Sequence, residues 1–185
     1  IADGAQVPVH VASGAPSCVP ARPFETSGAT LGPDAVSALL DRADVPYLSE
    51  MMNYPGVLDG APEVLSKIRA AQVRDKPVDG HAPGVRGDDA EQYAAAGIQT
   101  DHECVSIEEA REKLDAGMKI AIREGSAAKN FDALLPLMDE APERLLFCSD
   151  DRHPDALAVG HINGLVRRAL ARGYDRYDVL RAACV

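Results

Sequence analysis

Short apolar runs alternate with longer amphipathic stretches along this chain of 185 residues. The apolar runs predict strands at 7–11, 45–49, 76–80, 98–101, 118–122 and 145–148. The amphipathic stretches carry apolar residues at helical spacing and predict helices at 34–43, 62–73, 87–96, 106–116, 129–139, 154–172 and 176–184. About six strands, each followed by a helix, indicate an α/β protein with a parallel sheet.

Boundary residues support several of these helices. Ser106, followed three positions later by Glu109, forms a capping box at the start of one helix. Gly97 and Gly117 follow two predicted helix ends, as glycine often does. Pro136 lies inside another predicted helix and is expected to kink or end it.

Two parallel architectures compete, an open doubly wound sheet and a closed barrel. An open sheet gathers its ligand at one switch point, whereas a barrel carries functional residues at the ends of many strands. Nearly every predicted strand here ends in a residue that could bind a metal or take part in catalysis. The chain also has no nucleotide-binding glycine motif. These features favour a (β/α)₈ TIM-like barrel. It is expected to be incomplete, because such a barrel typically needs about 250 residues.

Composition and charge argue against several classes of function. The net charge of −10 and the pI of about 4.9 argue against nucleic-acid binding, which usually needs a basic face. The four cysteines form no C-x-x-C pair and are expected to be buried thiols of a cytosolic protein. No apolar run approaches the roughly 20 residues that span a bilayer. We therefore expect a cytoplasmic enzyme that acts on a small molecule away from membranes.

Four residues follow strand ends and form the candidate centre: Glu50, His81, His102 and Asp150. Two imidazoles and two carboxylates suit a divalent Zn, Fe or Mn ion, which lowers the pKa of its water toward about 7. Each residue also has a structural alternative. Either histidine could be a hydrogen-bonded core residue, Glu50 an ion-pair partner, and Asp150 or Asp151 a helix N-cap.

Longer motifs make the chain recognisable. They are PSCVP at 16–20, FETSG at 24–28, SEMMNYPG at 49–56, DGHAPG at 79–84, DHE at 101–103, REGSAAK at 123–129 and CSDDRHP at 148–154. In this order they resemble the amidohydrolase superfamily and, within it, the bacterial adenine deaminases. The resemblance implies a (β/α)₈ barrel of the metal-dependent hydrolase type with a binuclear Mn or Fe centre. It also implies hydrolysis of adenine to hypoxanthine and ammonia by an enzyme that is a homodimer.

The resemblance also implies roles for single residues. Glu50 is expected to bridge the metals, His81 and His102 to be ligands, and Asp150 to be both a ligand and the proton shuttle. Asp151 is the alternative for the shuttle, because the two aspartates are adjacent. Four residues are expected to bind the substrate: Arg123, Glu124, Ser126 and Asp151. Their structural alternative is an ion pair and a helix cap.

One departure from the family concerns its first strand. The His-x-His pair of that strand is absent, and the only earlier histidine is His10. Residues 1–185 are therefore expected to form a partial catalytic barrel, without the His-x-His region and without the family's flanking small β domain. Two other functions stay open: an amidohydrolase acting on another aminopurine or a cyclic amide, and a truncated barrel that is inactive alone.

Overall fold

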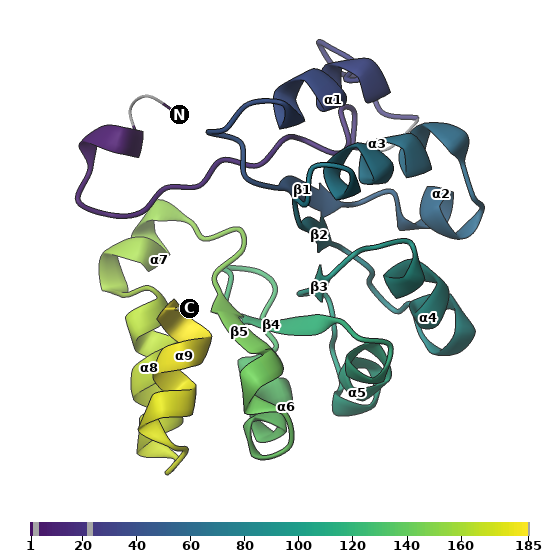
Figure 1. Cartoon of the computed structure of the whole chain (residues 1–185). Coiled ribbons are helices and arrows are strands. Elements are labelled where there is room, and N and C mark those ends of the chain that lie inside the picture. The colour runs from purple at the N-terminus through teal and green to yellow at the C-terminus, as the bar shows by residue number, and fades with distance from the viewer. Residues whose placement is uncertain (2–3, 22–23, 185) are drawn as a thin grey trace. The chain divides into compact units, whose positions relative to one another are not determined.

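The computed structural model describes residues 1, 4–21 and 24–184 (Figure 1). It is a mixed α/β chain that divides into two compact units. The first unit spans Ile1–Ala82 and Asp88–Gln99, and the second spans Pro83–Gly87 and Thr100–Val185. Each unit has its own parallel sheet. The predicted α/β class with parallel strands is therefore confirmed.

The first unit contains a two-stranded sheet and most of the early helices. Its elements are η1 (Gly4–Gln6), α1 (Pro33–Leu40), β1 (Leu48–Met51), α2 (Tyr54–Leu58), α3 (Pro62–Gln72), β2 (Val78–Gly80) and α4 (Gly87–Ala95). β1 and β2 pair in parallel, with Leu48 opposite Val78 and Met51 opposite Gly80. This pairing places the carboxyl ends of both strands at one edge of the sheet.

The strand predicted at 7–11 was wrong. That segment is irregular, and Val7, Val9 and Val11 are 48%, 65% and 51% exposed. Pro8 has no backbone N–H to donate, which weakens any ladder through this segment. The chain makes a parallel bridge only later, where Ala15 meets the fully buried Leu48.

The second unit contains a three-stranded sheet. Its elements are β3 (Thr100–Asp101), α5 (Ile107–Asp115), β4 (Lys119–Arg123), α6 (Phe131–Leu134), η2 (Leu135–Asp139), η3 (Pro142–Arg144), β5 (Leu145–Cys148), α7 (Pro154–Val159), α8 (Ile162–Ala171) and α9 (Arg176–Cys184). The strands lie in the order β3-β4-β5 and pair in parallel. Neighbours in the sheet are therefore successive in the chain, as a βαβ winding requires.

Two predicted helices are broken. The helix expected at 129–139 changes from α to 3₁₀ after Leu134, because Pro136 cannot donate the backbone hydrogen bond of an α-helix. The helix expected at 154–172 is two helices, since α7 ends at Val159 and α8 begins at Ile162. The short helix α2 was not predicted; its N-cap Asn53 accepts a hydrogen bond from the N–H of Gly56.

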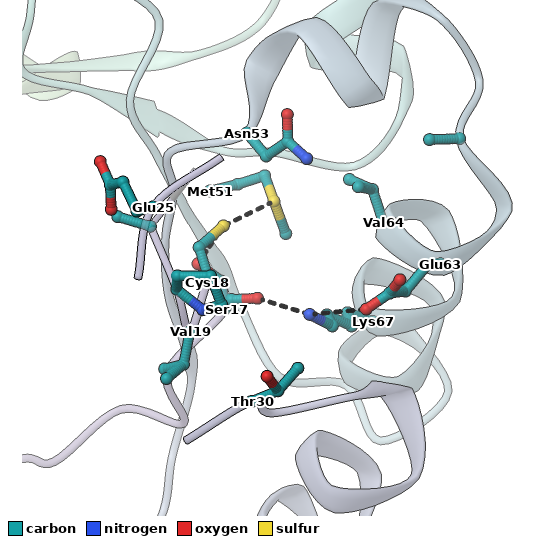
Figure 2. A pocket seen from close by; sticks show the side chains of 13 residues that line it. Ser17, Cys18, Val19, Glu25, Thr30, Met51, Asn53, Glu63, Val64 and Lys67 are labelled. Atoms are coloured by element: carbon teal, nitrogen blue, oxygen red, sulfur yellow. Dashed lines mark hydrogen bonds and ion pairs between the residues drawn. The ribbon is translucent and has the colours of Figure 1, made fainter. Parts of the chain in front are cut away.

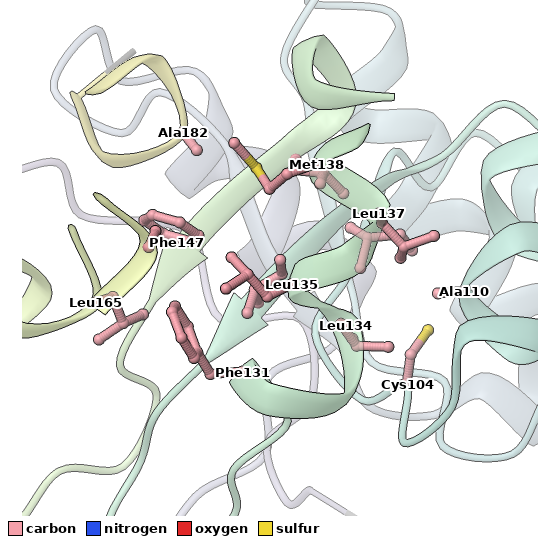
Figure 3. Close-up of a cluster of buried hydrophobic side chains, with 14 of the residues drawn as sticks. Cys104, Ala110, Phe131, Leu134, Leu135, Leu137, Met138, Phe147, Leu165 and Ala182 are labelled. Carbon is pink, nitrogen blue, oxygen red and sulfur yellow. The ribbon is translucent and has the colours of Figure 1, made fainter. Parts of the chain in front are cut away.

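A cluster of buried apolar side chains holds β4 and β5 against the surrounding helices (Figure 3). Ile120 and Ile122 of β4 are fully buried within it. The rings of Phe131 and Phe147 lie 5.9 Å apart between centroids, at 51° to each other. This core fixes the end of β4, where Arg123 lies, and the end of β5, just before Asp150.

Among the described residues, no helix is both long enough and apolar enough to cross a membrane.

Phe131 offers a direct test of this core. Replacement of Phe131, which is fully buried, with alanine should lower the free energy of unfolding by about 3–5 kcal/mol, because it removes a ring and leaves a cavity. Val159→Ala is the matched control; that side chain is 88% exposed, and its loss should change stability by less than about 0.5 kcal/mol. Urea denaturation measures both. Equal effects of the two substitutions would contradict this description of the core.

Candidate functional site

Glu50 and His81 lie together at the carboxyl ends of β1 and β2. Glu50 is inside the end of β1, and His81 comes directly after β2. The Nδ1 atom of His81 is 3.4 Å from the Oε2 atom of Glu50, and both side chains are partly exposed. Parallel pairing explains this proximity, since it aligns the two strand ends. The first unit therefore brings together two of the predicted ligands.

A buried tyrosine ties these strand ends to each other. The hydroxyl of Tyr93, on α4, donates to the carbonyl of Met51 at 3.0 Å and accepts from the N–H of His81 at 3.0 Å. The side chain is fully buried. Ser17 adds a second support, because its hydroxyl donates to the carbonyl of Glu50. Tyr93 lies in the helix predicted at 87–96, and nothing in the sequence signals these contacts.

His102, Glu103 and Asp150 form a second cluster at the carboxyl ends of β3 and β5. Each offers a ligand atom, and these atoms lie within 4.8 Å of one another. The Nε2 atom of His102 is 3.4 Å from the Oε1 atom of Glu103. Two predicted ligands, His102 and Asp150, are thus neighbours in the second unit. Glu103 is an additional member that we did not select from the sequence, although it lies in the DHE motif.

Arg123 occupies the space between the two carboxylates of this cluster. Its Nη1 atom is 2.6 Å from Glu103 Oε1 and 2.6 Å from Asp150 Oδ2, and its Nη2 atom is 2.8 Å from Glu103 Oε2. Burial by itself lowers the pKa of the guanidinium, but the hydrogen bonds and charge of Glu103, together with Asp150, outweigh burial and raise it. Arg123 is therefore a permanent cation that forms ion pairs with two carboxylates.

The two adjacent aspartates have different surroundings. The Asp150 backbone is left-handed, with φ of +50°, and its carboxylate meets Arg123. Asp151 contributes its carbonyl, which accepts from the N–H of Ser126 at 2.9 Å, while its side chain is exposed. A non-glycine residue with positive φ is uncommon and occurs often at functional sites. The geometry distinguishes Asp150 as the residue within the cluster.

The other residues predicted to bind substrate make structural contacts. The carboxylate of Glu124 accepts from Arg168 NH1 at 2.7 Å. The hydroxyl of Ser126 accepts from the N–H of His153 at 2.8 Å. His161 Nε2 lies 3.0 Å from the hydroxyl of Ser149, also in the segment after β5. These contacts fit the alternative of ion pairs and loop supports.

Asn130 links the ends of β3 and β4. Its Oδ1 atom accepts from the N–H of Arg123 at 2.7 Å, and its Nδ2 atom donates to the carbonyls of His102 and Cys104 at 3.2 and 3.0 Å. The residue is 6% exposed. Asn130 lies inside the helix predicted at 129–139, where an asparagine gives no signal of such contacts. It is instead the residue just before α6, with its side chain turned toward the strand ends.

The donor atoms fit a divalent metal in the first unit more simply than in the second. Glu50 and His81 supply oxygen and nitrogen, a combination that Zn, Fe and Mn accept. In the second unit a guanidinium already lies between Glu103 and Asp150, so a metal there would compete with Arg123. A third cluster, Asp101, Cys104 and Glu109, contains the ammonium of Lys113 and thus already has its cation.

The first unit also contains a cavity of about 490 Å³ next to the end of β1 (Figure 2). Cys18 points toward Met51 in this view, and Lys67 points toward the main chain of Ser17. The sulfur atoms of Cys18 and Met51 are 3.9 Å apart, and Lys67 Nζ donates to the carbonyl of Ser17 at 3.1 Å. These contacts hold the 16–20 segment against β1 and so support the main chain at Glu50.

Two bidentate arginine–glutamate pairs in the second unit allow a matched test. Arg123 and Glu103 have side chains that are 10% and 12% exposed, whereas Arg111 and Glu140 are 50% and 42% exposed. Arg123→Met should lower the free energy of unfolding by about 3 kcal/mol, because it leaves nearly buried carboxylates unpaired. Arg111→Met should have no measurable effect, since solvent screens that pair. Similar losses for both variants in urea denaturation would refute the special role of Arg123.

No family model matches this chain. Curated adenine deaminases do match it, and along nearly all of its length. The chain is 85% identical over 185 residues to the adenine deaminase of Salinibacter ruber, of which it covers 34%. It is 60% identical over 172 residues to that of a Sulfurovum species and 53% identical over 182 residues to that of Methanosarcina mazei, with 32% and 33% of those proteins covered. The chain thus spans about one third of the length of these relatives. Its resemblance to the adenine deaminases, which the motifs indicated, is confirmed along the whole of the chain.

Proposed function

We propose that the full-length protein that contains this chain hydrolyses adenine to hypoxanthine and ammonia at a divalent metal centre. The observation that carries the proposal is the 85% identity, over the whole chain, to a protein named adenine deaminase. The histidine–carboxylate clusters at the ends of parallel strands are consistent with it. Neither cluster resembles a nucleotide-phosphate site, which would present glycines and backbone N–H groups.

We further propose that residues 1–185 are part of a (β/α)₈ barrel. Support comes from the parallel strands, which neighbour one another in chain order, and from the helices that separate them. The relatives are about three times as long as the matched region. In this proposal, other parts of the longer protein supply the His-x-His pair and the small β domain that the family resemblance implies.

Four residues of this chain are proposed to hold the metal centre: Glu50, His81, His102 and Asp150. Glu50 and His81 lie together in the first unit, and His102 and Asp150 lie together in the second. A bound Mn, Fe or Zn ion supplies Lewis acidity and an acidified water for attack on C6 of adenine. The resemblance favours a binuclear Mn or Fe centre, and the ligand types alone accept any of the three metals.

Asp150 is proposed to move the proton. Its carboxylate takes a proton from the attacking water and delivers it to a ring nitrogen or to the leaving amine. Arg123 keeps this carboxylate in place through the 2.6 Å hydrogen bond. The exposed side chain of Asp151 lacks such a support among the described contacts, which favours Asp150 over its neighbour.

Recognition of the purine ring stays a prediction for Arg123, Glu124, Ser126 and Asp151. The ion pairs that occupy Arg123 and Glu124 favour structural roles for these two. A homodimer and a cytoplasmic location also stay predictions. A second functional possibility is that the 185 residues alone are inactive, and it is favoured by their coverage of only about one third of each relative.

The substrate is tested by incubating the full-length protein, loaded with Mn or Fe, with adenine and measuring ammonia and hypoxanthine. We expect one ammonia for each hypoxanthine formed. A panel of other aminopurines and cyclic amides serves as the control. Turnover of a panel member without turnover of adenine would refute the proposed substrate and favour the related amidohydrolase alternative.

The proton shuttle is tested by comparing Asp150→Asn with Asp151→Asn. The first substitution should lower kcat roughly 10²–10⁴-fold, because an amide cannot accept the proton. The second should leave kcat close to that of the unmodified protein. Steady-state kinetics with metal content measured on each preparation separates proton transfer from loss of metal. A large kcat defect in Asp151→Asn alone would assign the shuttle to Asp151.

A further inference from the structure

A buried ion triad lies beneath the turn that carries His102 and Glu103. Lys113, on α5, places its Nζ atom 2.9 Å from Asp101 Oδ2 and 2.9 Å from Glu109 Oε1. The side chains of Lys113 and Asp101 are fully buried, and that of Glu109 is 3% exposed. The i,i+4 spacing of Glu109 and Lys113 would ordinarily form a surface pair; here both face the protein interior.

The two carboxylates of the triad bind the main chain around this turn. Asp101 Oδ2 accepts from the N–H of Glu103 at 3.1 Å and from the thiol of Cys104 at 3.2 Å. Glu109 Oε2 accepts from the N–H of Val105 at 3.1 Å. The segment that carries His102 and Glu103 is therefore anchored by one carboxylate near its start and by the other at its end.

Glu109 also holds a second segment in place. Its Oε1 atom accepts from the N–H of Gly84 at 3.1 Å, in the stretch 83–87 of the same unit. Gly84 has φ of +69°, a left-handed conformation that most side chains avoid. In a capping box, the Glu109 carboxylate would accept from the N–H of the N-cap residue, Ser106. Here it accepts from the N–H groups of Val105 and Gly84 instead.

The contribution of these three buried charges to the stability of the fold does not by itself explain why they are there. One ammonium and two carboxylates are withdrawn from water, and well-packed apolar residues often give equal or greater stability than buried ions. Burial, followed by the charge of Asp101, raises the pKa of the Cys104 thiol, so this group stays protonated and donates to Asp101. The described contacts of the triad thus go to main-chain N–H groups of the turn and of Gly84, to the Cys104 thiol and to its own counter-charge.

We propose that Lys113, Asp101 and Glu109 are positioning residues that set the orientation of His102 and Glu103 for metal and substrate. The inference rests on the proposed function for its catalytic consequence, but the orientation of His102 is measurable without activity. Outer partners of metal ligands commonly change metal affinity or activity by roughly 10–100-fold when they are removed.

The test uses a variant of the full-length protein that keeps the net charge of the triad. Lys113→Met alone leaves two buried carboxylates unpaired and is expected to unfold the region. Combining Lys113→Met with Glu109→Gln removes one charge of each sign, leaves Asp101 as the one remaining charge, and keeps one acceptor oxygen at position 109 for the N–H of Val105 or of Gly84. Lys119→Met, on the exposed start of β4, is the matched control.

Two readouts are taken on each variant whose circular dichroism shows a folded protein. The first is the ring resonance of His102 in a proton–carbon NMR spectrum, identified by its loss in His102→Gln. The second is the separation of kcat from KM with adenine. We expect the double variant to shift the His102 resonance but not those of His153 and His161, and to lower kcat roughly 10–100-fold with little change in KM.

The possible outcomes are distinguishable. An unchanged His102 resonance in the folded double variant would overturn the positioning role, and so would a shift of equal size in Lys119→Met. If the unmodified protein does not act on adenine, the proposed function fails, while the NMR comparison still decides the positioning role. A folding failure of the double variant is addressed by Lys113→Arg, which keeps the charge and is expected to shift the same resonance by changing the geometry of the ammonium site.

Discussion

The strand ends of the second unit depend on the pairing of buried carboxylates with two cations. Lys113 neutralises Asp101 and Glu109 beneath the turn after β3, and Arg123 joins Glu103 to Asp150 above it. Without Lys113, the buried carboxylates of Asp101 and Glu109 would be unpaired, and without Arg123 the nearly buried Glu103 would lose its cation. The two cations therefore allow acidic groups to be held near the turn that carries His102 and Glu103.

Hydrogen bonds from uncharged side chains also hold the strand ends in place, in both units. Tyr93 joins the ends of β1 and β2 through the main chain at Met51 and His81. Asn130 joins the ends of β3 and β4 through the main chain at His102 and Arg123. In each unit, one buried polar side chain thus fixes the distance between two strand ends without the help of a ligand. A catalytic group held in this way loses little conformational freedom when it reacts.

The sequence was sufficient for features that depend on local pattern. Apolar spacing and proline predicted α1 and α3, the Ser106 cap predicted the start of α5, and a continuous apolar run predicted β5. It failed where the outcome depends on distant partners. The valines of 7–11 alternate like a strand, yet they find no pairing partner in the described part of the chain. The sequence gives no sign that Lys113 is buried, because its partner Asp101 lies twelve residues earlier in the chain. Arg123 was predicted to bind substrate, whereas its guanidinium pairs with Glu103, twenty residues earlier.

The central claim is that Glu50, His81, His102 and Asp150 hold a metal ion in the full-length protein. The most direct measurement is the metal content of purified His81→Gln and His102→Gln variants after loading with Mn and removal of free metal. The exposed His10 provides a control, His10→Gln. The account predicts that the unmodified protein and His10→Gln retain Mn, and that His81→Gln and His102→Gln lose most of it while remaining folded. Equal metal content in all four proteins would contradict the claim.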